Sequence, residues 1–371
     1  MTDTETRLRD YLTSQAATVP DDAQGPGLDS TRRRRHWPVV AAAAAIAVVA
    51  VLAASFLSRS SGNDTAPART PAPPVSGAAP ELPYMNPETS TLHDGKQTVK
   101  LPKGFANSYF ERVAGGWMGI RMAKPGEFRT GVLQPNGTFR PLGPERSDQS
   151  TLSPDRKLVA LWHYLSNTKG QVIVVDVRSG RQVAQLPAGS LHPDIVGWNQ
   201  DGLWMTTGKA ELIVWKPSTG AKRTVSIPGF DGSASVPKAA ATIAVSAKAG
   251  GKQCVRAGVL REDGFKVLRE YCAEGQPHLY PVLSPDGRTM VQSFAGVAID
   301  VNTGQVTKLQ VPNHMLDVLP EPAFENGTQL LTLNESQDGN RLSYDLWRCD
   351  VTSGACKQLI KKADGFSFVQ H

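Results

Sequence analysis

The chain has 371 residues, a net charge of +6, 20% charged residues, 34 glycines and 27 prolines. This length allows one large domain with additional segments, or two domains. The glycine and proline content excludes a collagen-like or wholly disordered protein, and four cysteines are too few for a small disulfide-stapled scaffold.

Residues 1–36 form a short segment in which six arginines balance six acidic residues. Residues 4–17 allow one helix with Leu8, Tyr11 and Leu12 on a single face. A segment of this length cannot bury a core of its own. It is therefore predicted to be either a disordered tail or a docking peptide for another protein.

Residues 38–57 contain no charged side chain and are rich in Ala, Val, Ile and Leu. As a helix, such a stretch spans ~30 Å, the thickness of the hydrocarbon core of a bilayer. Trp37 and the arginines Arg32, Arg33, Arg34 and Arg35 precede it, which is typical of the anchors of a spanning helix. We predict a transmembrane helix over residues 37–57, with a buried soluble helix as the alternative.

The same arginines predict the orientation of the helix, because only Arg59 lies close on the other side. The positive-inside rule places residues 1–36 in the cytoplasm and the rest of the chain outside it. A cleaved signal peptide is the alternative, but its apolar core is shorter and begins earlier. We therefore expect a single-pass cell-membrane protein with an uncleaved signal anchor, whose first partner is the lipid bilayer.

Residues 58–83 are rich in Ser, Ala, Pro and Gly and are predicted to be a partly stiff linker. From residue 84 to residue 371 a unit recurs in which two strand-like segments flank a glycine turn. Successive turn glycines are separated by 42, 43, 40, 44, 40 and 50 residues. A period near 43 is typical of a four-stranded propeller blade. The turn glycines are Gly95, Gly137, Gly180, Gly220, Gly264, Gly304 and Gly354.

A second motif precedes the inner strand candidates: Ser153-Pro-Asp-Arg-Lys157 and Ser284-Pro-Asp-Gly-Arg-Thr289. Followed one strand later by an Asp-Val-x-Thr/Ser-Gly turn, it resembles the repeat of TolB-like and WD-repeat-like β-propellers. The overall layout resembles actinobacterial single-pass membrane proteins with such an ectodomain. The resemblance implies an all-β fold over residues 84–371. In the Ser-Pro-Asp turns we expect Asp155 and Asp286 to bond the backbone and Gly287 to adopt positive φ.

The number of turn glycines favours seven blades, with six as the alternative. The first turn precedes any inner strand of its own blade, and residues 365–370 follow the last complete blade. We therefore expect the two chain ends to share one blade and close the ring.

The four cysteines form two pairs, each symmetric about its own turn. Opposed positions on paired strands bring cysteines within reach of a disulfide. We predict the disulfides Cys254–Cys272 and Cys349–Cys356, which an extracytoplasmic location favours. A zinc site is the alternative, but the sequence has no Cys-x2-Cys and no histidine beside either pair.

Motifs for catalysis are absent from the sequence: there is no Gly-x-Ser-x-Gly, no His-Glu-x-x-His and no phosphate-binding loop. His163, His192, His278 and His314 belong to different blades and would meet only through loop placement. The tryptophans are predicted to pack between strands; they are Trp162, Trp198, Trp204, Trp215 and Trp347. No catalytic residue, cofactor or metal is predicted.

Three functions remain open on this evidence. The first is a binding or sensing propeller outside the cytoplasm, with a protein or envelope-polymer partner and with a tail that reports to a regulator such as a sigma factor. The second is an envelope hydrolase or lyase with its site at the central mouth of the propeller. The third is a scaffold within a membrane complex. Nucleic acid is not an expected partner, because no dense basic patch with aromatic residues occurs and the domain is predicted to lie outside the cell.

Overall fold

The computed structural model describes residues 75, 77–86, 89–105, 110–122, 124, 127–166, 169–189, 193–207, 211–273, 280–293, 296–311, 322–338 and 341–361. They belong to one compact unit, Thr70–His371. These residues contain strands and no helix, so no helix among them could cross a membrane. The predicted tail, the transmembrane helix over 37–57 with Arg32–Arg35 and Trp37, and most of the linker lie outside the residues described.

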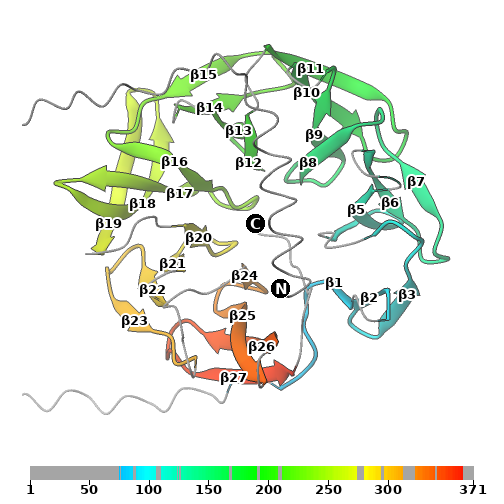
Figure 1. The fold of residues 1–371 in the computed structure, drawn as a ribbon. Helices are drawn as coiled ribbons and strands as arrows, with labels where there is room; N and C mark the ends of the chain where they lie inside the picture. The colour runs from blue at the N-terminus through cyan, green and yellow to red at the C-terminus, as the bar shows by residue number, and fades with distance from the viewer. Residues whose placement is uncertain are drawn as a thin grey trace, which may run out of the picture. The chain divides into compact units, whose positions relative to one another are not determined.

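The strands form seven antiparallel sheets that follow one another around a ring (Figure 1). We number the sheets as blades in chain order. Blade 1 contains β1 (Tyr84–Asn86), β2 (Thr91–Asp94) and β3 (Gln97–Lys100); blade 2 contains β4 (Glu111–Val113), β5 (Gly116–Met122), β6 (Phe128–Leu133) and β7 (Phe139–Pro141). Blade 3 contains β8 (Ser147–Leu152), β9 (Leu158–Tyr164), β10 (Gly170–Asp176) and β11 (Gln182–Gly189); blade 4 contains β12 (Asp194–Asn199), β13 (Gly202–Thr207), β14 (Glu211–Trp215) and β15 (Lys222–Val225). Blade 5 contains β16 (Phe230–Ser235), β17 (Thr242–Ala249), β18 (Lys252–Arg261) and β19 (Gly264–Ala273); blade 6 contains β20 (Pro281–Leu283), β21 (Thr289–Gln292), β22 (Val297–Asp300) and β23 (Val306–Lys308). Blade 7 contains β24 (Ala323–Phe324), β25 (Gln329–Asp338), β26 (Arg341–Asp350) and β27 (Cys356–Ile360).

This is the predicted seven-bladed β-propeller, and the six-bladed alternative was wrong. In blades 2 to 7 the turn glycine lies between the third and the fourth strand, or in blade 5 begins the fourth strand, and in blade 1 Gly95 lies between β2 and β3. The three strands of blade 1 therefore correspond to the second, third and fourth strands of the other blades. The segment 365–370, predicted to complete this blade, lies outside the residues described.

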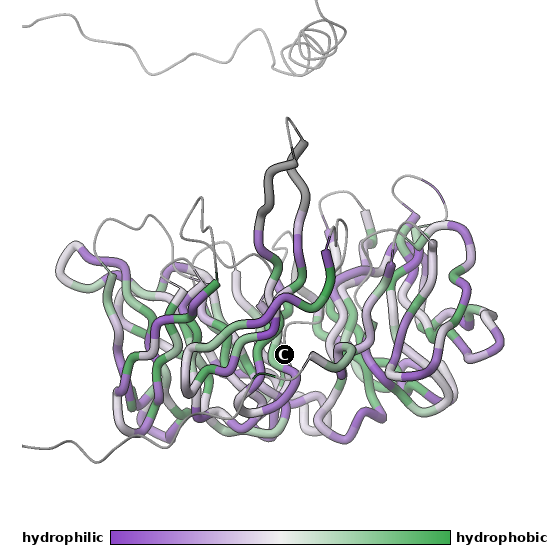
Figure 2. Tube along the Cα trace, turned by 90° about the horizontal axis from the view of Figure 1, so that it is seen from below, coloured by the Kyte–Doolittle hydropathy of each residue, from purple (hydrophilic) through white to green (hydrophobic). Residues whose placement is uncertain are grey.

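The core of the ring is divided into seven apolar clusters, and each cluster lies between two neighbouring blades. Between blades 3 and 4, for example, Trp162 and Val172 pack with Trp198, Met205 and Trp215. Strand centres are accordingly apolar and most turns hydrophilic when the ring is seen from the side (Figure 2). Alternation along each strand supplies an apolar residue to both faces of a sheet, so every blade depends on its two neighbours.

The two Ser-Pro-Asp turns, between the first and second strands of blades 3 and 6, have the predicted geometry. The Asp286 Oδ1 accepts a hydrogen bond from the Ser284 hydroxyl at 2.6 Å and from the Arg288 N–H at 3.1 Å. Gly287 has φ +72°, as predicted. In blade 3 Asp155 plays the same part, and Arg156 adopts φ +58° without the help of a glycine.

In blades 3, 6 and 7 the turn between the third and fourth strands is capped by an aspartate four residues before the glycine. Asp300 Oδ1 accepts hydrogen bonds from the Thr303 N–H at 2.6 Å and the Thr303 hydroxyl at 2.9 Å. The Thr303 N–H bond is the main reason that the pKa of Asp300 lies below its ordinary value. Asp176 and Asp350 cap their turns in the same way. All seven turn glycines have positive φ, and at Gly354 an added Cβ would lie 2.2 Å from the Lys308 carbonyl oxygen.

The ring is closed by the segment that precedes β1. Arg348 on β26 makes two hydrogen bonds to Glu325, at 2.5 and 2.9 Å, and both side chains are at most 3% exposed. The same guanidinium donates to the carbonyl oxygens of Ala78 and Ala79 at 2.9 and 3.1 Å. Leu82 and Tyr84 then pack against the apolar cluster of blade 7. A buried ion pair thus holds the start of the ring on its last blade.

Both predicted disulfides are present. Cys254 is joined to Cys272 between β18 and β19, and Cys349 to Cys356 between β26 and β27. Each joins the third strand of a blade to its fourth strand, and no free cysteine occurs.

Arg348→Ala is expected to lower the free energy of unfolding by about 3–5 kcal/mol, because it leaves the carboxylate of Glu325 buried without its partner. Urea unfolding followed by tryptophan fluorescence measures the change. Lys124→Ala is the matched control, since the Lys124–Glu127 pair is 74% and 52% exposed and is expected to contribute less than about 0.5 kcal/mol. Similar losses in the two variants would contradict the closure assigned to Arg348.

Asp300→Ala is expected to lower the free energy of unfolding at pH 7 by about 1 kcal/mol through the lost turn bonds. Because the folded pKa of Asp300 is lowered, its contribution is present above the unfolded value and is lost as the pH falls through the folded value. The difference between wild type and variant should therefore shrink as the pH falls below about 4. Asn302→Ala, in the same turn, should show no such pH-dependent difference, and a difference that is constant from pH 7 to pH 3 would contradict the assignment.

Candidate binding groove

Arginines on outer strands join neighbouring blades at three boundaries. In each case the guanidinium donates to a carbonyl oxygen in the turn between the third and fourth strands of the next blade. Arg140 donates to Val177 at 2.8 Å, Arg223 to Arg261 at 2.8 Å and Glu262 at 3.0 Å, and Arg269 to Val301 at 3.2 Å and Asn302 at 2.7 Å. These contacts bridge the outer edges of the boundaries between blades 2 and 3, 4 and 5, and 5 and 6.

The boundary between blades 3 and 4 has no arginine here: counted from the turn glycine the residue is Val183, which lies in a β-bulge, and Ala184 pairs with Val174 as Arg223 pairs with Val214. Val183 follows its turn glycine by three residues, as Arg140 and Arg223 follow theirs. Its side chain is 45% exposed. The turn carbonyls that an arginine would reach in blade 4 belong to Pro217 and Ser218, by their place relative to the turn glycine. An open space therefore replaces the arginine contact.

Two cavities occupy this boundary. The larger has a volume of about 540 Å³ and is lined on one side by Val183 and Ala184 of β11, and on the other by Trp198 and the turn that begins at Lys216. The smaller, of about 160 Å³, lies farther along β11, at Leu186 and Pro187. Facing them on blade 4 are Met205, Ile213 and Lys222. We call this space beside β11 the outer groove.

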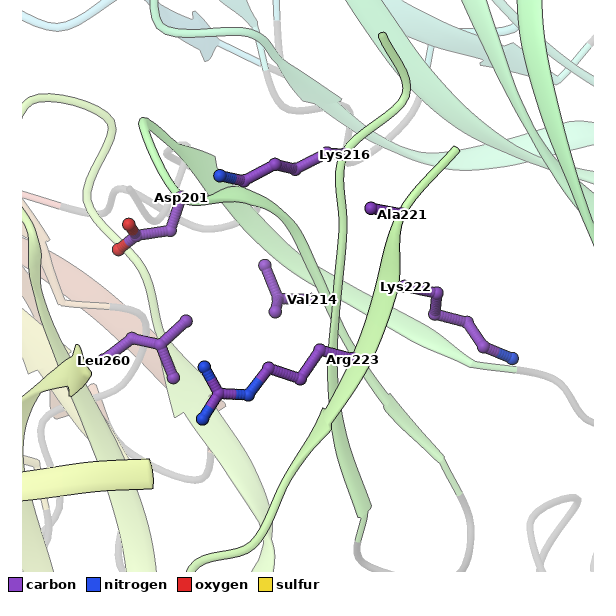
Figure 3. A pocket seen from close by; sticks show the side chains of 7 residues that line it. All are labelled: Asp201, Val214, Lys216, Ala221, Lys222, Arg223 and Leu260. Carbon is purple, nitrogen blue, oxygen red and sulfur yellow. The ribbon is translucent and has the colours of Figure 1, made fainter. Parts of the chain in front are cut away.

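A third cavity, of about 240 Å³, lies on the other side of blade 4, toward blade 5 (Figure 3). Lys216, Arg223 and Asp201 surround the apolar side chains of Val214 and Leu260, while Lys222, at its edge, points away from them. Lys216 and Lys222 thus border cavities on both faces of blade 4.

The outer edge of blade 4 is basic because of a change in its turn. Lys216 occupies the position that Asp176 and Asp300 hold in blades 3 and 6, four residues before the turn glycine. The turn keeps its backbone bond, from the Gly220 N–H to the Lys216 carbonyl oxygen at 2.9 Å. The acidic residue at these cavities is Asp201, whose pKa is raised by burial against the opposing effect of Lys216.

The inner part of the same boundary is firmly joined. Gln149 on β8 donates to Asp194 Oδ1 at 3.2 Å and accepts from the Ile195 N–H at 3.2 Å. Beside it the Tyr164 hydroxyl donates to Asp148 at 3.1 Å, and burial, with a further contribution from Asp148, raises the pKa of Tyr164 to about 12. Blades 3 and 4 are therefore joined near the axis as well as through their apolar cluster, and the two cavities lie toward the outside.

The centre of the ring is crossed by a buried ion pair. Lys238, in the loop between β16 and β17 of blade 5, lies 3.2 Å from Glu111 on β4 of blade 2. Their side chains are 13% and 5% exposed. The loop is held to blade 4 by a bridge between Gly197 and Val236 and by the Asn199 amide, which donates to the Ala240 carbonyl. Side chains of blades 2 and 5 therefore meet across the ring at this level.

The residues singled out from the sequence are distributed through the fold. Trp162, Trp198, Trp204 and Trp215 are buried between blades, and Trp347 packs on the cluster between blades 6 and 7, as predicted. His163 lies on β9, whereas His192, His278 and His314 lie outside the residues described. Cys254, Cys272 and Glu270 lie close together, but both thiols are used in the disulfide, which speaks against the zinc alternative.

The outer groove was missed in the sequence. A signal for it was available, because the repeat alignment places Val183 where two other blades carry arginine and Lys216 where other turns carry aspartate. Recognising it requires knowing that the arginine reaches the next blade.

Comparison with family models and with curated proteins finds no match. Among solved structures the chain is similar to TolB from Acinetobacter baumannii, at 15% identity over 70% of this chain and 64% of that chain, with a TM-score of 0.44. The match therefore spans slightly less than two thirds of that TolB chain. The Swd1 β-propeller domain from Myceliophteria thermophila has 11% identity over 72% and 90% of the chains and a TM-score of 0.48. A computationally designed protein, Ika8, has 15% identity over 76% and 84% and a TM-score of 0.50. At these identities the comparisons bear on the fold alone.

Val183→Arg is expected to place a guanidinium over the carbonyls of Pro217 and Ser218 and to raise the free energy of unfolding by about 1 kcal/mol. Arg223→Val, the reverse change at the boundary between blades 4 and 5, should lower it by about 1–2 kcal/mol. Urea unfolding measures both. If both Arg223→Val and Val183→Arg lowered the free energy of unfolding, an arginine would not be tolerated at the boundary between blades 3 and 4. The absence of an arginine would then not explain the groove.

Proposed function

We propose that this protein is a membrane-anchored propeller that acts outside the cytoplasm as a non-catalytic binding module. The observation that carries the location is the pair of disulfides, because each bridges two strands of a blade and such bonds persist in oxidising compartments. The charge-free run at residues 38–57, behind Arg32–Arg35, supports an anchor that leaves the propeller on that side of the membrane.

The outer groove supports binding as the activity. It combines an apolar floor, which includes Trp198 and Ile213, with exposed cations at Lys216 and Lys222. Such a mixture is typical of a surface that recognises another macromolecule. Propellers host many activities, so the proposal rests on this surface and not on the fold.

A catalytic site at the central mouth is the weaker proposal. The acids described near the axis already have partners: Glu111 pairs with Lys238, and Asp148 and Asp194 accept hydrogen bonds from Tyr164 and Gln149. Among the residues that the structure describes, these acids make no hydrogen bond to a histidine, serine or cysteine, and Tyr164, which donates to Asp148, has a pKa raised to about 12, which disfavours its nucleophilic phenolate form.

The amino-terminal segment extends the proposal across the membrane. Residues 1–36 are too short for a domain and carry a possible amphipathic helix, so we propose that they dock on a cytoplasmic regulator, such as a sigma factor. The propeller would then report the state of its partner to that regulator.

Protease treatment of intact cells tests the location. The chain should be cut after residue 58 while an amino-terminal epitope stays protected inside. Crosslinking in native membranes, followed by mass spectrometry, should then recover different partners for residues 1–36 and for the propeller. Protection of the propeller in intact cells that becomes cleavable only after lysis would overturn the proposal.

A further inference from the structure

We propose that the outer groove binds an extended segment of a partner protein in which acidic and apolar side chains alternate. The inference rests on the proposed function, since it names the class of partner that the propeller would take. Three features of the groove carry it: its course along a strand, its apolar walls and its cations.

The groove follows a single outer strand. Its larger cavity lies at Val183 and Ala184, and its smaller cavity at Leu186 and Pro187, in sequence along β11. From Val183 to Pro187 a strand advances ~13 Å, at about 3.3 Å per residue. An extended segment of about four to six residues matches this length and places side chains in both cavities.

The smaller cavity has largely apolar walls, whereas the larger one combines apolar walls with the polar residues Asn199, Gln200 and Ser218. Leu158 and Trp198 border the larger cavity, and Val172, Met205 and Ile213 border the smaller one. An anionic polymer without apolar groups, such as a chain of phosphates, would desolvate its charges against these walls without compensation. A peptide supplies apolar side chains for the cavities and keeps its charged side chains at the rim.

The side chains at the rim of the outer groove are positively charged. Lys216 and Lys222 are exposed and border the two cavities of the groove in turn. The adjacent Arg223 adds a third positive charge while it holds the turn of blade 5. Asp201 lies on the blade 5 side, where Lys216 already acts on it. Charge complementarity therefore selects acidic side chains, spaced to meet Lys216 and Lys222 along one edge of the segment.

The test uses the full-length protein in detergent micelles and a fluorescein-labelled peptide, Glu-Val-Glu-Leu-Glu-Val. Fluorescence anisotropy should show saturable binding that weakens as salt is raised. The peptide with lysine in place of each glutamate should not bind. Unlabelled inorganic polyphosphate of matched charge should compete poorly.

The decisive variant is Lys216→Asp, which installs the residue that other turns of this propeller carry and so should fold normally. It is expected to weaken peptide binding about tenfold, and Lys222→Glu should do the same. Lys96→Asp is the matched control, because Lys96 is also exposed, lies in the corresponding turn of blade 1 outside the groove, and should leave binding unchanged. Unfolding midpoints of the three variants establish that each is folded.

Equal binding by the lysine peptide, or unchanged binding in Lys216→Asp, would overturn the inference. If polyphosphate competed as well as the unlabelled peptide, the ligand class would be an anionic polymer and not a peptide. If the bound peptide were released as the protein concentration rose, the groove would be occupied by a second copy of the chain. These outcomes are independent of location, because they are read on purified protein. A failure of the proposed function would instead appear in the protease experiment on cells.

Discussion

Every blade of this protein buries its two faces only against its neighbours, so the fold depends on the ring being complete. Seven apolar clusters, one for each boundary, are the physical form of that constraint. A linear stack would leave two apolar faces in water. The contact of Leu82 and Tyr84 with blade 7 removes those faces, and the buried pair of Arg348 and Glu325 fixes where it happens.

Because the closed ring depends on the apolar clusters in its core, the residues at the outer edges of the boundaries between blades can vary. Within each blade the strands supply apolar residues to the clusters on both faces, so a change in the core would disturb two clusters at once. Farther out, the same position carries Arg140 or Arg223 in some blades and Val183 in another, and the ring is maintained in each case. Binding surfaces can therefore arise at a boundary between blades without a change in the core. We place the binding surface of this protein at such a boundary for that reason.

The sequence predicts much of the fold because its signals are local and repeated. Gly95 to Gly354 mark the turns through their backbone conformation, and the spacing between them gives the blade. The cysteine pairs were predictable because each is symmetric about one turn. The outer groove was not, since Val183 and Lys216 acquire meaning only when the neighbouring blade is known. The closure by Arg348 was hidden for a similar reason: its partners Ala78 and Glu325 lie far from one another in the chain.

The clamp on residues 78–79 has a mechanical consequence. Tension on the chain ahead of Ala78 would enter the ring at blade 7, where a guanidinium grips two carbonyl oxygens and a carboxylate together. The force would be shared by the hydrogen bonds that Arg348 makes to Ala78, Ala79 and Glu325, and these would have to break at nearly the same time. A segment held in this way resists the strand-by-strand separation of blade 1 from β1 onward. A pulling force would therefore displace the propeller as one unit before it unfolded the first blade.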